Sequence, residues 1–412
     1  MKILYLAFAC NPYAGSEAYC GWAWPSTMRN LAEVYLVTRR ENRESIERYI
    51  QENQITNLRV FYHDIPSWMN VYYKTKRLYH LYYLIWQKTS VRLIRKLNKA
   101  YRFDYIHQVT LGDFRSINGS CRLSDTKFIF GPVGGAQSTP KAFSEYVKNN
   151  AKSERIRDFI NRMLCLSPTY RSKLNHAKWV FAANPETQRY LQRLMKNPER
   201  CRLLTENGIY EQRLCPKMQS DSVEQTQPDN TKVSLLWVGR VVNKKGLSFL
   251  LDVLHEVKTS TVYELTIIGD GPERPYLEGK TEQLGLNEQV RFVGGLPYEQ
   301  VQEFYKKADI FVFPSFRETT GTVLFEAMSH ELPVITFNQN GAALLVSEQT
   351  GRKIDVDQGI DVIRRDFSAA IQELVDHAMT RKKLGSNAYE LMRETYTWEN
   401  KCKNFYAEIL NA

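Results

Sequence analysis

Short apolar runs alternate with amphipathic segments along all 412 residues, and this alternation constrains the fold more than any other feature. It is typical of strand–helix–strand units built around parallel sheets. We expect strands over residues 3–9, 34–37, 58–61, 105–109, 128–130, 179–182, 235–238, 265–268, 290–293, 310–313 and 334–337. Helices are expected between them, for example over 245–257, 299–306 and 323–329. The sequence therefore predicts an α/β protein with doubly wound sheets.

The length suits two domains better than one. Residues 216–232 are rich in Ser, Gln, Asp and Asn and have no apolar period, which is typical of a linker. We therefore expect one Rossmann-like domain over 1–215 and a second over 233–397. The last residues, 398–412, are expected to form a helix that can cross back to the first domain. In this arrangement two domains face each other across a cleft, with ligands at the carboxyl ends of the strands.

The composition excludes several classes of protein. Hydrophobic residues make up 43% and charged residues 25%, which excludes a disordered or fibrous chain. There is no run of 18 apolar residues, and the short run over 3–10 fits a first strand better than a signal peptide. The seven cysteines lack Cys-x-x-Cys spacing, which argues against a disulfide framework and a zinc knuckle. We expect a reduced, cytoplasmic compartment.

Positive charge is concentrated in the first half, where residues 1–220 hold 35 Lys and Arg against 17 Asp and Glu. Between Asp64 and Asp104 there is no acidic residue. Basic residues recur there at steps of three and four along one helical face, namely Lys88, Arg92, Arg95, Lys96 and Lys99. Aromatic residues nearby, such as Tyr82 and Trp86, would suit a lipid headgroup boundary. The pattern predicts peripheral binding to an anionic membrane; the alternative is a helix packed on the first domain with a solvated basic side.

Two glutamates in the second half follow the strand expected over 310–313. Glu318 falls in the loop at the carboxyl end of that strand, and Glu326 falls on the next helix. Residues 319–322 would offer free backbone amides at the helix N-terminus, which suits an anion, and Gly321 allows a bound group to approach closely. The alternative is a surface loop with two solvated glutamates.

A second cationic loop follows the strand expected over 235–238. Arg240 and Lys245 would lie at the mouth of the sheet, where a planar guanidinium and an ammonium suit a diphosphate. The alternative is a solvated turn. The Gly-Asp-Gly-Pro sequence at 269–272 is, on its own, a tight turn after a strand.

Together these motifs resemble the retaining GT-B glycosyltransferases of sequence family four, the glycosyl transferases group 1, and in particular members that build bacterial surface polysaccharides. The most specific stretch is ADIFVFPSFRETTGTVLFEAM at 308–328, followed by LPVI at 332–335. Supporting stretches are NPYAGSE at 11–17, IHQVT at 106–110, GPVGG at 131–135, ENGI at 206–209, GR at 239–240, KG at 245–246 and VRFVG at 290–294. The sequence departs from the family at Glu331, where glycine is usual, and at Tyr210, where aspartate is frequent.

The resemblance implies transfer of a sugar from a nucleoside-diphosphate sugar, with UDP and GDP both open, and retention of the anomeric configuration. Arg240 and Lys245 would stabilise the leaving group in place of a metal ion, so neither metal nor cofactor is expected. By the family pattern, Glu318 would contact the donor sugar and Glu326 the ribose. The neighbouring sugar and nucleotide contacts would come from Thr319, Thr320, Gly321, Thr322 and Val323.

In the first half, the resemblance implies a loop for donor phosphate or acceptor formed by Gly15, Ser16, Gly134 and Gly135. It also places His107 at the donor-sugar site, where it would position the sugar or its leaving oxygen. The alternatives are simple turns for the glycines and a hydrogen-bonded wall residue for His107. Asp355 and Asp357 match a metal motif of other transferases, but a solvated turn explains them better.

The expected partners are a nucleotide sugar and a glycan or lipid-linked glycan acceptor at the inner face of the cell membrane. Another GT-B enzyme, such as a sugar phosphorylase or a nucleotide-sugar epimerase, is an alternative that shares the fold. The pI near 9.1 also admits a nucleic-acid-binding protein, but no recognition motif accompanies it, so no nucleic acid is expected.

Overall fold

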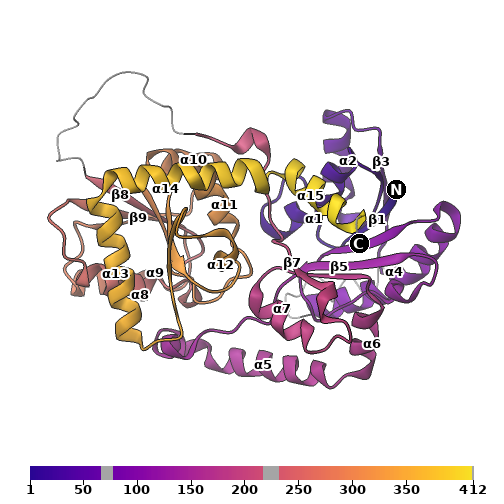
Figure 1. Ribbon diagram of the computed structural model, residues 1–412, viewed down its shortest axis with the longest axis horizontal. Coiled ribbons are helices and arrows are strands. Elements are labelled where there is room, and N and C mark those ends of the chain that lie inside the picture. Colours follow the sequence, from indigo (N-terminus) through magenta and orange to yellow (C-terminus); the bar gives the residue numbers. More distant parts are fainter. Residues whose placement is uncertain (66–77, 217–231, 411–412) are drawn as a thin grey trace. The chain divides into compact units, whose positions relative to one another are not determined.

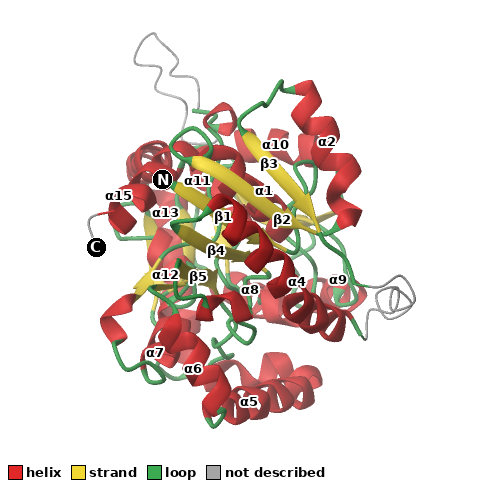
Figure 2. Cartoon of the chain, turned by 90° about the vertical axis from the view of Figure 1, so that its right-hand side faces the viewer, coloured by secondary structure: helices red, strands yellow, loops and turns green. Residues whose placement is uncertain are grey.

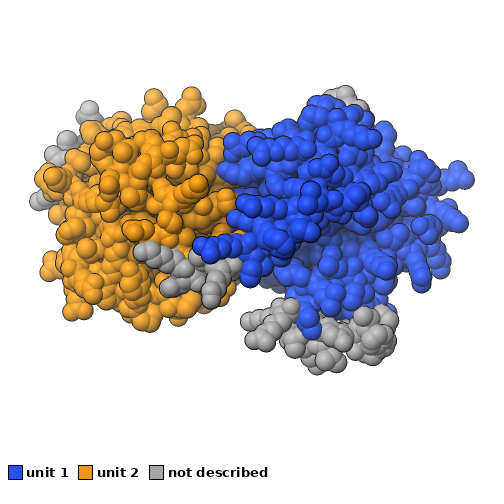
Figure 3. Space-filling model, turned by 90° about the horizontal axis from the view of Figure 1, so that it is seen from below, with its two compact units in different colours: residues 1–137, 155–208, 398–412 blue, residues 138–154, 209–397 orange. Residues whose placement is uncertain are grey.

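The computed structural model describes residues 1–65, 78–216 and 232–410. The chain divides into two compact units (Figure 3). Unit 1 comprises Met1–Gln137, Arg155–Gly208 and Trp398–Ala412, and unit 2 comprises Ser138–Glu154 and Ile209–Thr397. Each unit is an α/β body built on a single parallel sheet (Figure 1).

The division differs from a simple split near residue 215. Residues 138–154 belong to unit 2, because Phe143 stacks on Phe316 with ring centroids 4.3 Å apart and also packs against Phe337. The C-terminal helix α15 (Trp398–Leu410) belongs to unit 1. The expected linker lies outside the described residues except for its two ends, residues 216 and 232.

Unit 1 holds a seven-stranded parallel sheet in the order β3-β2-β1-β4-β5-β6-β7. Its strands are β1 (Lys2–Ala7), β2 (Glu33–Thr38), β3 (Leu58–Tyr62), β4 (Tyr105–Thr110), β5 (Lys127–Val133), β6 (Trp179–Ala182) and β7 (Cys201–Leu203). Its other helices are α1 (Ser16–Met28), α2 (Arg43–Glu52), α4 (Tyr79–Tyr101), α5 (Ala151–Cys165, which begins in unit 2), α6 (Pro168–His176) and α7 (Pro185–Gln192).

Side chains of unit 1 alternate between the two faces of its sheet, as the strand period requires. Leu4 and Leu6 pack on the face covered by α4, α6 and α7. His107 of β4 lies on the opposite face, where Trp24 of α1 and Phe405 of α15 contact its ring. Both faces of the sheet are therefore covered by helices, which is the arrangement of a doubly wound fold.

Unit 2 holds a six-stranded parallel sheet in the order β10-β9-β8-β11-β12-β13. Its strands are β8 (Val233–Val238), β9 (Tyr263–Ile268), β10 (Val290–Gly294), β11 (Ile310–Phe313), β12 (Val334–Phe337) and β13 (Gly351–Ile354). Its helices are α8 (Leu247–Glu256), α9 (Arg274–Gln283), α10 (Tyr298–Lys307), α11 (Thr322–Ser329), α12 (Ala342–Leu345), α13 (Ile360–Asp376) and α14 (Ala378–Leu391).

The core of unit 2 also has two sides. Leu235 and Trp237 pack with α8, α9 and α13, whereas Leu236 packs with α10, α11, α12 and α14. The strand order reverses at β8, whose two neighbours are β9 and β11. At such a reversal the following loops diverge to opposite faces and leave an opening at the carboxyl edge of the sheet. The loops that follow β8 and β11 are therefore the place to look for a site.

All strands expected from the apolar runs are present, and the α/β fold with two Rossmann-like sheets is confirmed. Two further strands, β7 and β13, were not expected. They are short and form the edges of their sheets. Because β13 includes Arg352 and Lys353, its sequence does not form an apolar run.

Candidate active site

The loop that follows β8 is tied to the loop that follows β11. The backbone N–H of Phe316 donates to the carbonyl oxygen of Lys244 at 2.9 Å. Gly246 has a φ of +75°, and a Cβ atom there would lie 1.9 Å from the carbonyl oxygen of Pro314. Only glycine allows this left-handed conformation together with so close an approach. The two loops are therefore held as one body at the reversal point of the sheet.

Lys245 and Glu318 form an ion pair on these loops. Their side chains are 15% and 22% exposed, so both charges are largely withdrawn from solvent. Burial raises the pKa of Glu318, but the charge and hydrogen bond of Lys245 outweigh it, so the pKa lies below its ordinary value. The Lys245 ammonium also lies 5.4 Å from the centre of the Phe313 ring. The structure brings together these two predicted site residues.

Lys244, which we did not single out in the sequence, lies beside this pair. Burial lowers the pKa of Lys244, and Glu318 acts in the opposite direction. Arg240, at the start of the same loop, is exposed. The loop therefore presents three cations next to one carboxylate, an excess of positive charge that suits an anion with more than one negative charge.

Helix α11 begins at Thr322, four residues after Glu318. Gly321 caps the helix at a φ of +94° without a side-chain hydrogen bond. Thr320 is fully buried, and its hydroxyl has no hydrogen-bond partner within the described part of the chain. The first backbone N–H groups of an α-helix have no partner within the helix, so Thr322 and Val323 stand at a donor-rich, positive end.

Glu326 lies one turn further along α11. The hydroxyl of Tyr305 donates to its Oε2 at 3.0 Å. Burial raises the pKa of Glu326 above its ordinary value, and this hydrogen bond opposes the rise. Glu318 and Glu326 thus have different environments: the first is paired with a cation, and the second is held by a phenol. Tyr305 was not predicted, because it lies on α10 and shares no motif with Glu326.

Close packing positions the loops around this site. A Cβ atom on Gly269 would lie 1.8 Å from the carbonyl oxygen of Gly239, so the loop after β9 lies directly on the loop after β8. A Cβ atom on Gly341 would lie 2.4 Å from the carbonyl oxygen of Thr319. Glu331, which replaces the glycine usual in the family that the sequence resembles, has a φ of +55°. The left-handed turn is thus retained by a non-glycine residue at a local backbone cost.

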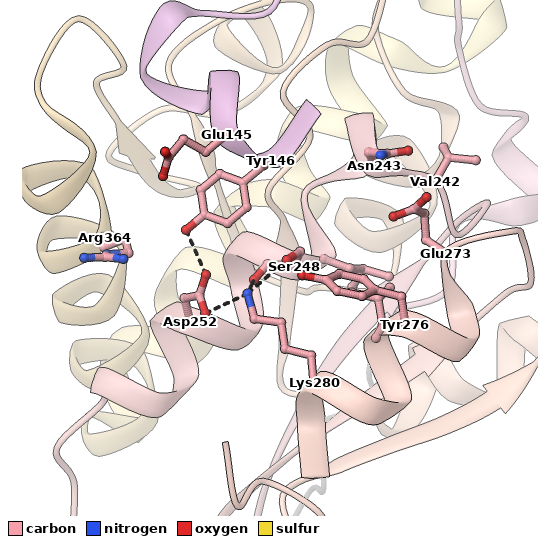
Figure 4. Close-up of a pocket in the computed structure, with 12 residues that line it drawn as sticks. Glu145, Tyr146, Val242, Asn243, Ser248, Asp252, Glu273, Tyr276, Lys280 and Arg364 are labelled. Atoms are coloured by element: carbon pink, nitrogen blue, oxygen red, sulfur yellow. Dashed lines mark hydrogen bonds and ion pairs between the residues drawn. The ribbon is translucent and has the colours of Figure 1, made fainter. Parts of the chain in front are cut away.

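A pocket of about 570 Å³ lies on unit 2 between α8 and α9 (Figure 4). Four of its polar side chains bind one another: Tyr146 donates to Asp252 at 2.8 Å, and Lys280 binds Asp252 at 2.7 Å and the Ser248 hydroxyl at 2.9 Å. The residues that line it do not include Lys245, Glu318 or Glu326. We therefore do not place the chemistry there.

In unit 1, the predicted glycines lie at the carboxyl ends of β1 and β5. Gly15 caps α1, and both Gly15 and Ser16 are exposed. Gly134 donates its N–H to the carbonyl oxygen of Gly112 at 2.8 Å, and Gly135 has a φ of +116°. Gly134 is buried and Gly135 is half-buried, and the Gly135 N–H donates to the Gln137 side chain at 2.7 Å, so both backbone N–H groups already have partners.

Glu17 bridges the reversal point of this sheet by accepting the backbone N–H of Gly112 at 2.5 Å. It does not form a side-chain cap on α1.

The structure does not support a site role for His107. Strand β4 continues to Thr110, so His107 lies within the strand and not at its end. Its ring is fully buried and stacks on Phe405, and Nε2 donates to the carbonyl oxygen of Gly131 at 2.6 Å. Burial lowers the pKa of His107 to about 3. His107 is a neutral core residue, because its side chain points to the face of the sheet that α1 and α15 cover.

The ENGI stretch at 206–209 is held by groups that the sequence did not reveal. The ammonium of Lys401, on α15, is buried and donates to the Thr205 hydroxyl at 3.2 Å and to the Asn207 carbonyl at 2.5 Å. The Asn207 side chain accepts from the Cys20 thiol at 2.8 Å. Burial lowers the pKa of Lys401 to about 7. This lysine is nearly 200 residues away in the sequence, so no local pattern could have identified it.

The basic residues expected at a membrane, namely Lys88, Arg92, Arg95, Lys96 and Lys99, are all exposed on α4. The aromatic residues are not available beside them, because Tyr82, Tyr83 and Trp86 are buried in the core of unit 1. These three side chains therefore do not form an aromatic headgroup boundary on this helix. Three further aromatic residues of the basic stretch, at positions 68, 72 and 73, lie outside the described residues.

Asp355 and Asp357 are exposed, and Asp355 accepts a hydrogen bond from the Asn338 amide at 2.7 Å. Within residues 1–65, 78–216 and 232–410, no group of three potential metal ligands comes together. In the same described ranges, no helix has both the length and the apolar character needed to cross a bilayer.

Comparison with known proteins shows which proteins this chain is similar to. The family model described as "Glycosyl transferases group 1" matches residues 218–391. The lipopolysaccharide core biosynthesis glycosyltransferase LpsD of Rhizobium meliloti is 32% identical over 160 residues, which cover 39% of this chain and 44% of that protein. The chain thus spans less than half the length of the curated relatives it matches.

Solved structures match over nearly the full length. A sucrose-phosphate synthase from Thermosynechococcus elongatus has a TM-score of 0.63 at 18% identity, covering 100% of this chain and 99% of that one. HepE of Anabaena, solved in complex with UDP and glucose, has a TM-score of 0.62 at 17% identity, covering 100% and 99%. These likenesses show the GT-B fold of two Rossmann-like bodies. Residues 218–391 of the chain are thus similar to the glycosyl transferases group 1 family.

Proposed function

We propose that the protein is a retaining, metal-independent glycosyltransferase that moves a sugar from a nucleoside-diphosphate sugar to a glycan or lipid-linked glycan in surface-polysaccharide synthesis. The observation that carries this proposal is the Lys245–Glu318 ion pair at the reversal point of the unit 2 sheet. A cation for the diphosphate and a carboxylate for sugar hydroxyls lie side by side there, and α11 begins four residues after the carboxylate with no side-chain hydrogen bond at its cap.

The positive groups of this loop suit the charge that develops in the reaction. When the bond between the sugar and the diphosphate breaks, negative charge builds on the leaving oxygen. Lys245, Lys244 and Arg240 would stabilise that charge together with the amides of Thr322 and Val323; one such preorganised donor is worth about 3 kcal/mol. These groups would replace the positive charge of a metal ion, because their own charge is held in place before the reaction.

The two glutamates would divide the substrate between them. Glu318 is ionised beside Lys245, so its oxygens can accept hydrogen bonds from sugar hydroxyls near the reacting carbon. Glu326 lies one turn along the helix and would accept from the ribose hydroxyls. The UDP in the HepE structure supports a nucleotide as ligand of this fold, and GDP remains equally compatible with the residues present.

The proposed acceptor is based on the relatives, and the proposed membrane location is based on the net charge of unit 1. LpsD is named for lipopolysaccharide core biosynthesis, which supports a surface-glycan acceptor. Unit 1 holds 32 Lys and Arg against 16 Asp and Glu, a net charge of +16, which suits an anionic lipid surface. We place the enzyme at the cytoplasmic face of the cell membrane.

A nucleotide panel tests the proposal. Thermal shift against UDP, GDP and their sugar conjugates should show stabilisation by one nucleoside diphosphate and its sugars. Release of that nucleotide should then require an acceptor extract, and the product should keep the anomeric configuration of the donor. Phosphate-dependent cleavage of a glycan would indicate a phosphorylase, and conversion of the donor without transfer would indicate an epimerase; either result would refute the proposal.

A further inference from the structure

Helix α5 contacts unit 1 through one side only. The side chain of Asn161 is buried and accepts from Arg115 Nε at 2.9 Å, while its carbonyl oxygen accepts from the Tyr190 hydroxyl at 2.5 Å. Leu164 and Cys165 pack against the core beside it. These residues are spaced three and four apart, so they occupy one face of the helix. Figures 1 and 2 show α5 lying alongside α6 and α7.

The opposite face of α5 is apolar and exposed. Ile156, Phe159, Ile160 and Met163 are 62%, 63%, 47% and 52% exposed, and Leu166, the first residue after the helix, is 72% exposed. Their spacing is the helical one, yet the stripe faces away from the protein, whereas an ordinary surface helix turns its apolar stripe inward. Among the described residues, five of the thirteen exposed large apolar side chains lie on this face or directly after the helix. A continuous apolar face of this kind marks an interaction surface.

Arginines accompany this face along its length. Arg155 and Arg162 are exposed on α5, and the exposed Arg171 donates from Nε to the carbonyl oxygen of Cys165 at 2.8 Å. The acidic residues of α5 are neutralised by arginines: Asp158 lies 3.7 Å from Arg157, and Glu154 forms an ion pair with Arg317. The face therefore combines apolar side chains with unopposed positive charge.

We propose that the exposed face of α5 docks on the surface of an anionic lipid bilayer. Apolar side chains would enter the boundary between headgroups and acyl chains, while the arginines along the helix bind lipid phosphates. This combination favours lipid as the occupant, because a protein partner would need a complementary apolar face and acidic groups as well. The proposal rests on the proposed function in that it supplies the membrane surface on which a lipid-linked acceptor resides.

The basic residues of α4 would have a different role from α5 in membrane binding. Lys88, Arg92, Arg95, Lys96 and Lys99 offer charge, but α4 exposes only two large apolar side chains among its described residues, Leu81 and Leu84, and both lie in its first two turns. Attraction that depends mainly on charge holds a protein to a membrane reversibly and is screened by salt. We therefore assign insertion to α5 and long-range attraction to α4.

Co-sedimentation of the full chain with vesicles tests the assignment. The vesicles are phosphatidylcholine alone or an equal mixture with phosphatidylglycerol. Wild type should bind the mixed vesicles, and the variant Phe159→Ser/Ile160→Ser/Met163→Ser should bind them about tenfold more weakly or worse. The matched control Val262→Ser/Met379→Ser removes exposed apolar groups from unit 2 and should bind as wild type does. Replacing Arg92, Arg95, Lys96 and Lys99 with Gln should weaken binding mainly at low salt.

Hydrogen exchange adds a measurement that needs no variant: residues 155–167 should become protected when mixed vesicles are added. Full binding by the triple variant, absence of wild-type binding, or protection confined to α4 would overturn the proposal. So would a dimer that the triple substitution dissociates, since a second copy would then cover this face.

Nucleotide binding by calorimetry separates this proposal from the proposed function. The triple variant should bind nucleotide as wild type does. Loss of vesicle binding with intact transfer to a soluble acceptor fits both proposals. Vesicle binding without any transfer would refute only the proposed function.

Discussion

Lys245 and Glu318 are 73 residues apart in the sequence and form an ion pair at the carboxyl edge of the unit 2 sheet. The pair exists because Gly246 lets the loop after β8 lie against Pro314, and because the Phe316 N–H fastens the two loops together. The relationship therefore depends on the backbone as much as on the two charges.

Replacing Lys245 with Gln should leave Glu318 buried without its cation. We expect the pKa of Glu318 to rise, because burial is then no longer outweighed, and the unfolding free energy at pH 7 to fall by about 1–3 kcal/mol. The pair stabilises the fold above the unfolded pKa of Glu318, and this contribution is lost as the pH falls through the lowered folded pKa. The double variant with Glu318→Gln should recover part of the loss in urea denaturation; additive losses would show that the pair is not coupled.

The backbone requirement at Gly246 can be tested separately from the charges. Gly246→Ala should destabilise the protein by about 2–4 kcal/mol, because its Cβ would clash with the Pro314 carbonyl at a φ of +75°. Gly279→Ala is the matched control: it lies in α9 with no atom within 4 Å of the added Cβ, and it should stabilise by about 0.5–1 kcal/mol. Equal thermal stability of the two variants would contradict the loop packing.

The burial of His107 predicts a pH dependence of stability and not of catalysis. Its pKa is about 3 in the folded protein and about 6.5 when unfolded. Its contribution to stability is therefore complete above pH 6.5 and declines as the pH falls from there toward the folded pKa. His107→Phe should flatten this decline relative to wild type and leave the pH–rate profile unchanged between pH 6 and 8. A catalytic limb near neutral pH that disappears in the variant would restore His107 to the site.

Activity should persist in EDTA. Arg240, Lys244 and Lys245 bring positive charge to one loop, so a divalent cation is not needed to stabilise the leaving diphosphate. The check is a transfer assay after exhaustive chelation, with and without added Mg²⁺. A complete loss of transfer that Mg²⁺ reverses would contradict this prediction.

Much of the fold follows from local pattern. Apolar runs located the interior strands of both sheets, because such strands are covered on both faces and need continuous apolar sequence. The edge strand β13 was missed because its Arg352 and Lys353 break the run. The assignment of residues 138–154 to unit 2 depends on Phe143 packing against Phe316, a long-range contact that local sequence does not encode.

The candidate site was predictable where motif and topology agree. Glu318 and Lys245 lie in loops that a parallel sheet brings to the same edge, so their proximity follows from strand order. His107 was misplaced because a motif locates a residue along a strand but does not say which face of the sheet its side chain occupies. The supporting groups Tyr305 and Lys401 were missed because each reaches its partner from a distant helix.

The most direct test of the central claim compares sugar transfer and nucleotide binding in Glu318→Gln. This substitution keeps the size of the side chain and its ability to form hydrogen bonds but removes the negative charge. Glu318 is assigned to the sugar, whereas Lys245 and Glu326 are assigned to the nucleotide. Turnover should therefore fall by about a hundredfold or more, while the affinity for the nucleoside diphosphate in calorimetry changes by less than about fivefold. Equal loss of turnover and affinity, or turnover that matches wild type, would contradict this division of roles.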